Sequence, residues 1–547
     1  MKLLIFCSFL VLSYSALNPL QGLVECTSCH LTIEALRAYA KESEHWNTLA
    51  EIFVDLCVES GQQKYVCQGL VNEFRPVVTD VLMDKILDPE FLCMDMEYCT
   101  SPHYVEENFT LYATEIMKGK PAGPGPNPTG ETTIKFAHIA DAHIDLYYTP
   151  GTSDECDEPQ CCRSGTGNAG YWGGMKCDLP LRTLEAALDQ VAAMNLDFII
   201  VTGDVPPHDV WNQSRSYNLL NIQTEAEIFQ KHIPNTPIYK IFGNHAPFPI
   251  NEYDYINDPY LPKAFCEYWN LDSITRIDLE KHAGYTIKHG DNLRLIVLDT
   301  NTMHSGNLYL SLNSTNPQGQ LTWLYEQLLA AEKSNEVVYI FGHVPPGDDF
   351  SLSNWARHYA VLMDRFEFTI AGTFYAHTHN DEFHIDRGVF SGKPTQVQWT
   401  APSLTTYSYK NPSIRVFEAD AKTKTLLDYT QYRLNLAEAN RNSSQTPVWE
   451  ANYSFKNLYG VSDLSPQSIY VLALEIGNNE NLALQYLSNF NTGINVPTRC
   501  DSKCMHILTC TITYGILDDE LNCQGVDKNW LYKFNEMLFG KWVYKVK

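Results

Sequence analysis

Short runs of β-forming residues recur through the middle of the chain, and five of them are followed at once by side chains that can bind a metal ion. Such runs, separated in part by helical stretches, predict an α/β fold with a buried sheet. Loops that leave the carboxyl ends of strands in such a sheet converge on one crevice. Five polar segments are therefore expected around one point: Asp141-Ala142-His143, Gly203-Asp204, Gly243-Asn244-His245, Gly342-His343 and His377-Thr378-His379.

The β-rich runs cover 132–140, 196–202, 237–242, 293–298, 336–341 and 368–372. The clearest helix is predicted for 181–195, because leucine or valine recurs there every three or four residues and Pro180 stands at its entrance. From about residue 435 onward, helical and turn signals predict a helical C-terminal region.

The residue types in the five polar segments suit a site for two metal ions. Carboxylate and amide oxygens together with imidazole nitrogens bind divalent ions, and one group can bridge a pair of them. Two ions about 3.5–4 Å apart can hold a phosphoryl group and share an acidified water that attacks it. With 17 histidines in the chain, a single Gly-His pair is more often a loop feature than a ligand, so the prediction depends on the ordered set.

Sixteen cysteines fall in clusters, which in an oxidising compartment indicates disulfides rather than metal thiolates. Six of them lie within alternating helical patterns between residues 24 and 100: Cys26, Cys29, Cys57, Cys67, Cys93 and Cys99. Six cysteines allow about fifteen pairings, so the sequence alone leaves their connectivity open.

The first residues are typical of a signal peptide that is cleaved near Ser15. Lys2 precedes an apolar run over 3–12, and small residues follow at 13 and 15. No later stretch has the roughly 18 apolar residues of a membrane span. We therefore expect entry into the secretory pathway, with a lysosomal or secreted, extracellular destination. Five glycosylation sequons fit that route: Asn108, Asn212, Asn313, Asn442 and Asn452.

A formal net charge of −26 at pH 7 argues against a broad basic face that holds nucleic acid. Repulsion among the carboxylates weakens as they are protonated, which favours an acidic compartment. No nucleic-acid partner is expected.

The ordered set DxH, GD, GNH, GH and HxH resembles the calcineurin-like metallophosphoesterase family over roughly residues 131–410. That resemblance implies a metallophosphoesterase sandwich that holds two zinc ions, although the same donor set could hold manganese or iron. The implied ligands of one ion are Asp141, His143 and His379, those of the other are Asn244, His343 and His377, and Asp204 bridges the two.

Two positions depart from the family pattern. An acidic residue commonly follows GNH, whereas Ala246 stands here, so the group that would orient His245 is missing or comes from elsewhere. The last motif usually begins with glycine, but Ala376 replaces it, and its methyl group could shift His377 slightly.

The six N-terminal cysteines resemble the saposin B-type family in their spacing, and the segment Gly203-Asp204-Val205-Pro206-Pro207-His208-Asp209-Val210-Trp211 resembles the acid sphingomyelinase family. The cysteine-rich loop after the first motif, the run from His377, and Thr400-Ala401-Pro402-Ser403 are also similar to that family. The implied disulfides are Cys26–Cys99, Cys29–Cys93, Cys57–Cys67, Cys156–Cys161, Cys162–Cys177, Cys500–Cys504 and Cys510–Cys523, with Cys266 left over.

The resemblance implies zinc-dependent hydrolysis of sphingomyelin, or a related phospholipid, to ceramide and phosphocholine. His208 and His245 would protonate the leaving group and stabilise the phosphate, in a division that the sequence leaves open. An acidic compartment would keep both imidazoles charged. His208 could instead orient Asp204 from outside the metal site. Tyr407 and Tyr409 could offer aromatic faces to choline, or could simply be packing or surface residues.

Two other functions remain possible at this stage. One is a related phosphodiesterase that cleaves nucleotides or other soluble diesters, and the other is a lipid-binding protein whose catalytic fold has decayed. The cysteine-rich helical domain would contact a membrane surface peripherally, or would have no lipid role.

The implied layout is a signal peptide over 1–15, a saposin B-type domain over 22–102, a proline-rich linker over 103–130, a metallophosphoesterase domain over 131–434 and a helical C-terminal domain over 435–547. The run 118–129 contains too many prolines for a strand and should be an extended, semi-rigid connector.

Overall fold

The computed structural model describes residues 19–40, 43–81, 87–95, 99, 104–106, 108–123, 127–312, 315–526 and 543–545. The predicted signal peptide at 1–15 lies outside these ranges. Within them, no helix is long and apolar enough to cross a membrane.

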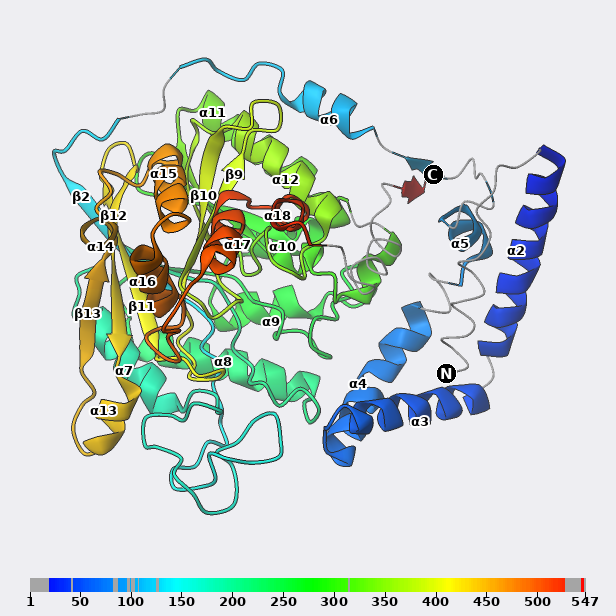
Figure 1. The fold of residues 1–547 in the computed structure, drawn as a ribbon, viewed down its shortest axis with the longest axis horizontal. Coiled ribbons are helices and arrows are strands. Elements are labelled where there is room, and N and C mark those ends of the chain that lie inside the picture. Colours follow the sequence, from blue (N-terminus) through cyan, green and yellow to red (C-terminus); the bar gives the residue numbers. More distant parts are fainter. Residues whose placement is uncertain are drawn as a thin grey trace.

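Four helices joined by disulfides form the N-terminal part of the chain and stand to one side of the two sheets (Figure 1). They are α2 (Pro19–Ala40), α3 (Ser43–Glu59), α4 (Lys64–Val81) and α5 (Pro89–Asp95). The three disulfides are Cys26–Cys99, Cys29–Cys93 and Cys57–Cys67. Disulfides of this kind stabilise small helical units that bury little apolar surface.

The chain then continues through β1 (Tyr104–Glu106), which pairs with β14 (Val543–Lys545), and through α6 (Phe109–Ile116) toward the two sheets (Figure 1). Lys120, just after α6, forms ion pairs with Asp364 near the end of the helix Ser353–Arg365 and with Glu367 just beyond it, which fix this end of the connector to that helix.

Twelve strands form two six-stranded sheets. The first sheet has the order β5-β6-β7-β8-β10-β9 and the second β13-β12-β11-β2-β3-β4. Strands β6, β7, β8 and β10 run parallel, as do β2, β3 and β4. The bounds in the first sheet are β5 (Gly284–His289), β6 (Leu293–Leu298), β7 (Val337–Phe341), β8 (Ile370–Tyr375), β9 (Glu382–Arg387) and β10 (Pro394–Thr400). Those in the second are β2 (Thr133–Ile139), β3 (Phe198–Val201), β4 (Ile238–Lys240), β11 (Ser413–Asp420), β12 (Leu426–Leu434) and β13 (Trp449–Ser454).

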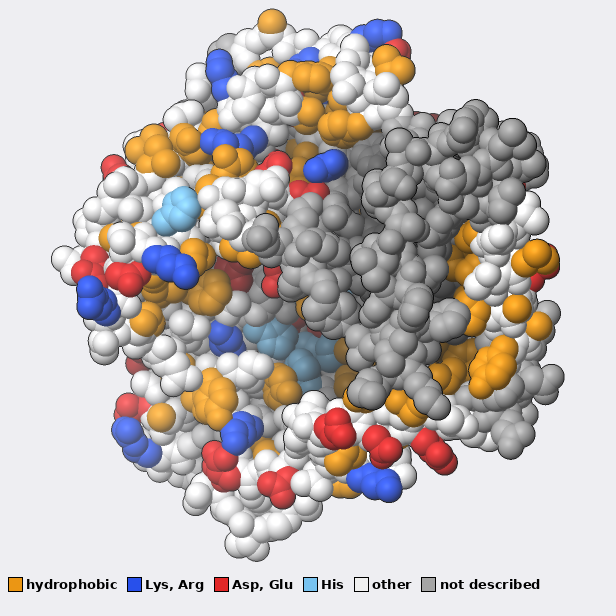
Figure 2. Space-filling model, turned by 45° about the vertical axis from the view of Figure 1, so that its right-hand side comes forward, with side chains coloured by type: hydrophobic (Ala, Val, Ile, Leu, Met, Phe, Trp, Pro, Cys, Tyr) orange, Lys and Arg blue, Asp and Glu red, His pale blue; other side chains and the backbone are white. Residues whose placement is uncertain are grey.

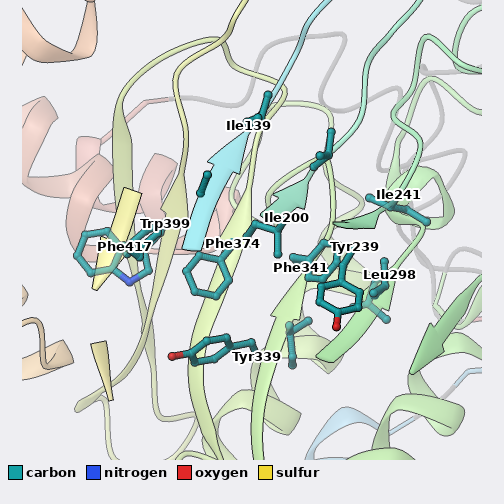
Figure 3. Close-up of a cluster of buried hydrophobic side chains, with 14 of the residues drawn as sticks. Ile139, Ile200, Tyr239, Ile241, Leu298, Tyr339, Phe341, Phe374, Trp399 and Phe417 are labelled. Carbon is teal, nitrogen blue, oxygen red and sulfur yellow. The ribbon is translucent and has the colours of Figure 1, made fainter. Parts of the chain in front are cut away.

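The core lies between the two sheets and is rich in aromatic side chains (Figure 3). Phe136 of β2 stacks on Phe198 of β3 with ring centroids 4.6 Å apart, and it meets Phe374 of β8 edge-on at 5.5 Å. All three rings are fully buried. Burial of such a side chain stabilises the fold by about 1.5–3 kcal/mol, so the packed rings hold the sheets together.

Helices and short 3-10 turns connect the strands and cover the sheets (Figure 1). Those of the central region are α7 (Leu181–Ala192), α8 (Arg215–His232), α9 (Tyr260–Tyr268), α10 (Ser273–His282), η2 (Thr300–Met303), η3 (Leu308–Leu312), η4 (Pro317–Gly319), α11 (Gln320–Lys333) and α12 (Ser353–Arg365). Those of the C-terminal region are α13 (Leu436–Arg441), α14 (Phe455–Tyr459), α15 (Pro466–Ile476), α16 (Glu480–Phe490), α17 (Ser502–Thr513) and α18 (Leu517–Gln524).

The α/β sandwich with a disulfide-bonded helical N-terminus and C-terminal helices confirms the predicted fold class. The C-terminal region also contributes β13, an edge strand that the helical signals around it concealed.

One buried ion pair ties the two sheets together beside the last histidine motif. Arg415 of β11 is fully buried and contacts the carboxylate of Asp381, which follows β8. Its guanidinium also donates to the carbonyl oxygen of Thr400 in β10 and to Gln431 Oε1 in β12, both at 3.0 Å. A planar guanidinium with several donors suits such a crossing point.

We predict that Arg415→Met destabilises the protein by about 3–5 kcal/mol, because it leaves the buried Asp381 carboxylate without its cation. Thermal and denaturant unfolding measure the loss. Arg441→Met, which removes an exposed pair with Glu438, is the matched control and should change stability by less than about 1 kcal/mol. Equal effects of the two substitutions would contradict this role for Arg415.

Candidate metal centre

All five polar segments lie at the carboxyl ends of parallel strands and meet at one place. Two of the segments follow β2 and β3, one follows β4, and the other two follow β7 and β8, so both sheets contribute. Figure 2 shows histidine side chains at the floor of a hollow in this face of the molecule. The seven predicted ligands and the two predicted catalytic histidines are thus brought together.

Five of the predicted ligands have a left-handed backbone, which non-glycine residues rarely adopt. Their φ angles are 49° at Asp141, 36° at His143, 53° at Asp204, 74° at His377 and 62° at His379. Such conformations cost about 1–3 kcal/mol each and persist only where the surroundings impose them. Here the strand exits turn sharply so that successive side chains face one point.

Glycines in the second and third segments are required by close packing around Asp204. A Cβ atom on Gly243 would lie 2.1 Å from Asp204 Oδ1, and one on Gly203 would lie 2.5 Å from the Gly243 nitrogen. Gly203 also has a φ of 101°. Neither position can hold a side chain while Asp204 keeps its place.

The donors form two clusters that share a boundary at Asp204. In the first, His143 Nε2 lies 3.1 Å from His379 Nε2, and His379 Nε2 lies 3.6 Å from Asp141 Oδ1. In the second, Asn244 Oδ1 lies 2.9 Å from both His343 Nε2 and His377 Nδ1.

Asp204 Oδ2 lies 3.1 Å from His343 Nε2 and 3.5 Å from His143 Nε2. It therefore stands between one histidine of each cluster. A carboxylate in this position can serve both halves of a two-ion site.

Hydrogen bonds outside the clusters turn the imidazole lone pairs inward. His143 Nδ1 bonds the carbonyl oxygen of Pro206 at 2.8 Å, and His343 Nδ1 bonds that of Thr202 at 2.7 Å. A ring whose Nδ1–H donates to a carbonyl leaves the Nε2 lone pair free for a metal ion. The donor set and its orientation therefore fit divalent ions.

The charges of the two aspartates lead to the same conclusion. Burial raises the pKa of Asp141, because removal from water disfavours the charged carboxylate. Burial also acts to raise the pKa of Asp204, but His343 and His245 beside it hold that pKa well below its usual range. Two buried carboxylates in one hollow need cations.

His208 and His245 lie on one side of the clusters. Their ring centroids are 4.7 Å apart, and that of His208 is 4.1 Å from that of His143. His208 is held by Asp178, whose Oδ1 accepts from His208 Nδ1 at 2.8 Å and whose Oδ2 accepts from the His208 backbone nitrogen at 2.6 Å.

His245 lacks such a partner. Its Nδ1 is buried without a hydrogen bond to any described residue, and its backbone nitrogen donates to Asp204 Oδ1 at 2.9 Å. The group that an acidic residue at 246 would supply is therefore missing, because Ala246 is buried and no neighbour in the described ranges replaces it.

Ala376 is accommodated. It is buried in a cluster of small residues with Ala140 and Ala401, and His377 next to it still reaches Asn244. The methyl group thus has room, and the shift expected at His377 does not prevent contact with the second cluster.

Two family models match the chain. The calcineurin-like phosphoesterase model matches residues 134–381, and the model of the acid sphingomyelin phosphodiesterase C-terminal region matches 394–529. The sphingomyelin phosphodiesterase A of Dictyostelium discoideum is 31% identical, over 92% of this chain and 91% of that protein. The chain belongs to the acid sphingomyelinase family. The sphingomyelin phosphodiesterase of Homo sapiens is 30% identical, over 92% of this chain and 83% of that protein. The cyclic GMP-AMP phosphodiesterase SMPDL3A of Homo sapiens is also 30% identical, over 72% of this chain and 90% of that protein.

Membership of the acid sphingomyelinase family implies divalent metal ions, which the two clusters can hold. One residue near the site escaped sequence reasoning. Asp178 directly follows Cys177, and nothing in its neighbourhood marked it as the partner of His208. Its only signal was its position next to the last cysteine of the cysteine-rich loop.

The cysteine-rich loop frames the His208 region through residues that follow its cysteines. Cys162 and Cys177 are bonded, and the next residues along the chain are Arg163 and Asp178. Arg163 contacts Asp145 and Asp209, so groups on both sides of this disulfide reach the loop that carries His208.

The other predicted residues lie outside the metal centre. The structure pairs the remaining cysteines as Cys156–Cys161, Cys500–Cys504 and Cys510–Cys523, and Cys266 is free and buried. Of the sequon residues, Asn108, Asn212 and Asn442 are exposed, Asn452 is partly exposed, and Asn313 lies outside the described residues.

Tyr407 stacks on His208 with ring centroids 3.9 Å apart, so one of its faces is already occupied, whereas Tyr409 is 40% exposed.

We predict that Asp204→Asn removes metal from both halves of the site together, because one carboxylate oxygen faces a histidine of each cluster. Elemental analysis of the purified protein measures the ions per chain, and a melting curve shows that the variant is folded. Asp291→Asn, in the exposed turn between β5 and β6, is the control and should retain all metal. Two ions per chain in the Asp204 variant would exclude the bridging position.

Proposed function

We propose that the chain hydrolyses sphingomyelin to ceramide and phosphocholine. The observation that carries the proposal is the convergence of seven oxygen and nitrogen donors beside two histidines, in a chain whose sphingomyelin phosphodiesterase relatives align with 92% of its length. The cyclic GMP-AMP phosphodiesterase aligns with 72%, so the sphingomyelin enzymes account for more of the chain.

We also propose that the centre holds two zinc ions. The first would be bound by Asp141, His143 and His379, the second by Asn244, His343 and His377, with Asp204 between them. Bound ions would neutralise the phosphoryl oxygens and lower the pKa of the attacking water.

His208 and His245 are then free to act on the diester itself. Burial lowers the pKa of His208 to about 3 and that of His245 to about 4. The sequence suggested that an acidic compartment would keep both imidazoles charged, but at these pKa values acidity does not by itself do so. A diester anion beside them would favour their protonated forms. Asp178 supports a cation at His208, and His245 has no equivalent partner.

We predict that His208→Ala and His245→Ala keep their metal but lose about a hundredfold or more in turnover of sphingomyelin, the scale of an acid–base group. The variant that lacks the proton donor should recover with bis(4-nitrophenyl) phosphate, whose leaving group departs without a proton. Elemental analysis and initial rates decide the matter. If neither variant is rescued, proton donation belongs to another group.

The helical N-terminal domain supplies a surface suited to lipid. A cavity of about 420 Å³ between α3 and α4 is lined almost wholly by apolar side chains, among them Trp46, Phe53, Leu70 and Phe74. Several apolar side chains on α2 and α3, Phe53 among them, are about half exposed: Leu31, Tyr39, Ile52, Phe53 and Leu56. Helices that turn apolar faces outward can contact a membrane surface.

We predict that Phe53→Ser and Leu56→Ser lower hydrolysis of sphingomyelin in vesicles at least about tenfold, and leave hydrolysis of bis(4-nitrophenyl) phosphate within about twofold. Detergent should restore the lipid activity. Asp55→Asn, exposed on the same helix, is the control. An equal loss on both substrates would show that these residues support the fold rather than lipid contact.

The domain layout inferred from the sequence remains our proposal: 22–102 saposin B-type, 103–130 linker, 131–434 catalytic and 435–547 C-terminal. Seven disulfides support passage through the secretory pathway, with a lysosomal or secreted destination and glycans on the sequon residues.

The rival function is hydrolysis of a soluble nucleotide diester, and one assay separates the two. The purified chain is incubated with sphingomyelin, phosphatidylcholine and a nucleotide diester at acidic and neutral pH, with and without chelator. We expect chelator-sensitive turnover of sphingomyelin above the others. Turnover of the nucleotide alone would favour the rival, and no turnover with a full metal complement would favour a binding protein.

A further inference from the structure

Helix α4 of the N-terminal domain packs directly against the loop that carries His208. The closest approach is at Gly69, in the interior of the helix, where an added Cβ atom would lie 2.1 Å from the carbonyl oxygen of Trp211. It would also lie 3.1 Å from Trp211 Cβ. Glycine weakens a helix interior, so its presence here is explained by the close packing rather than by helix formation.

One turn further along α4, Glu73 makes a polar contact with the same loop. Its Oε1 accepts a hydrogen bond of 3.0 Å from the backbone nitrogen of Gln213. The side chain of Gln213 then donates to the carbonyl oxygen of Pro207 at 2.7 Å and to Asp209 Oδ1 at 3.2 Å. These are the residues immediately before and after His208.

The cysteine-rich loop, together with Asp178 that follows it (residues 156–178), also holds the loop that carries His208. Arg163 contacts Asp209, and Asp178 bonds the backbone nitrogen and the ring of His208. The His208 loop is therefore supported both by the cysteine-rich loop and by α4. The Tyr65 hydroxyl of α4 also donates to Glu158 of the cysteine-rich loop, so α4 and that loop contact each other.

We propose that α4 is part of the support of the active site, with Gly69 and Glu73 acting as positioning residues for the His208 loop. The helical domain then contributes to hydrolysis of any diester at the metal centre, soluble or in a membrane. The expected effect on hydrolysis rests on the proposed role of His208, whereas the support of the loop by α4 does not.

Two substitutions disturb the contact in different ways. Gly69→Leu forces α4 away from Trp211, and Glu73→Ala removes the acceptor while the helix packing remains possible. Glu73→Gln keeps an oxygen at the same place. Burial raises the pKa of Glu73 to about 7, so in acidic solution the native side chain is neutral and Gln imitates it well. Asn72→Ala, exposed on the same helix, is the matched control.

The full-length variants are tested at acidic pH with a short-chain sphingomyelin below its micelle concentration. We expect Gly69→Leu and Glu73→Ala to lower kcat about tenfold or more with KM changed less than about threefold, at unchanged metal content, the effect of a displaced group. Glu73→Gln and Asn72→Ala should remain within about twofold of the parent. Loss of vesicle activity alone, with normal kcat on the soluble lipid, would overturn the proposal.

Hydrogen exchange of residues 205–213 gives a readout that does not depend on turnover. Exchange should rise in Gly69→Leu and Glu73→Ala and return to the parent level in Glu73→Gln. Unchanged exchange in the first two variants overturns the inference, whatever the assays show. If the parent chain hydrolyses no sphingomyelin, the proposed function fails, and the exchange result still decides whether α4 supports the loop.

Discussion

The burial of two carboxylates in one hollow is the constraint on which the rest of the site depends. Asp141 and Asp204 are withdrawn from water, where their charges are costly unless cations or donors surround them. Histidine side chains from three loops and the backbone nitrogens of His245 and His377 supply part of that compensation. The left-handed strand exits and the glycines beside Asp204 are consequences, since only such a backbone directs so many side chains to one point.

Both sheets must keep their relative position for this arrangement to exist. The DxH, GD and GNH segments leave one sheet, whereas the GH and HxH segments leave the other. The two halves are held by the aromatic core between the sheets and by Arg415, which joins both sheets next to His379. Stability of the sandwich and geometry of the metal centre are thus determined by the same contacts.

The sequence sufficed to predict that the five polar segments converge, because each begins within about five residues of the end of a β-rich run and parallel strands bring their ends together. It could not reveal Asp178, because its partner His208 lies in a distant part of the sequence. It could not reveal Gln213 either, because that residue bonds Pro207 within a loop that has no periodic pattern. It also did not reveal Glu73, which meets Gln213 across 140 residues of sequence. The absence of an acid after His245 was visible in the sequence, but only the structure shows that no described neighbour takes its place.

The disulfide between Cys162 and Cys177 adds a chemical condition to this geometry. Neither sulfur lies among the metal-binding groups, yet the residues that follow them hold His208 and its neighbour Asp209. Reduction of this disulfide would therefore weaken the support of the loop that carries His208 while leaving every metal-binding side chain in place along the chain.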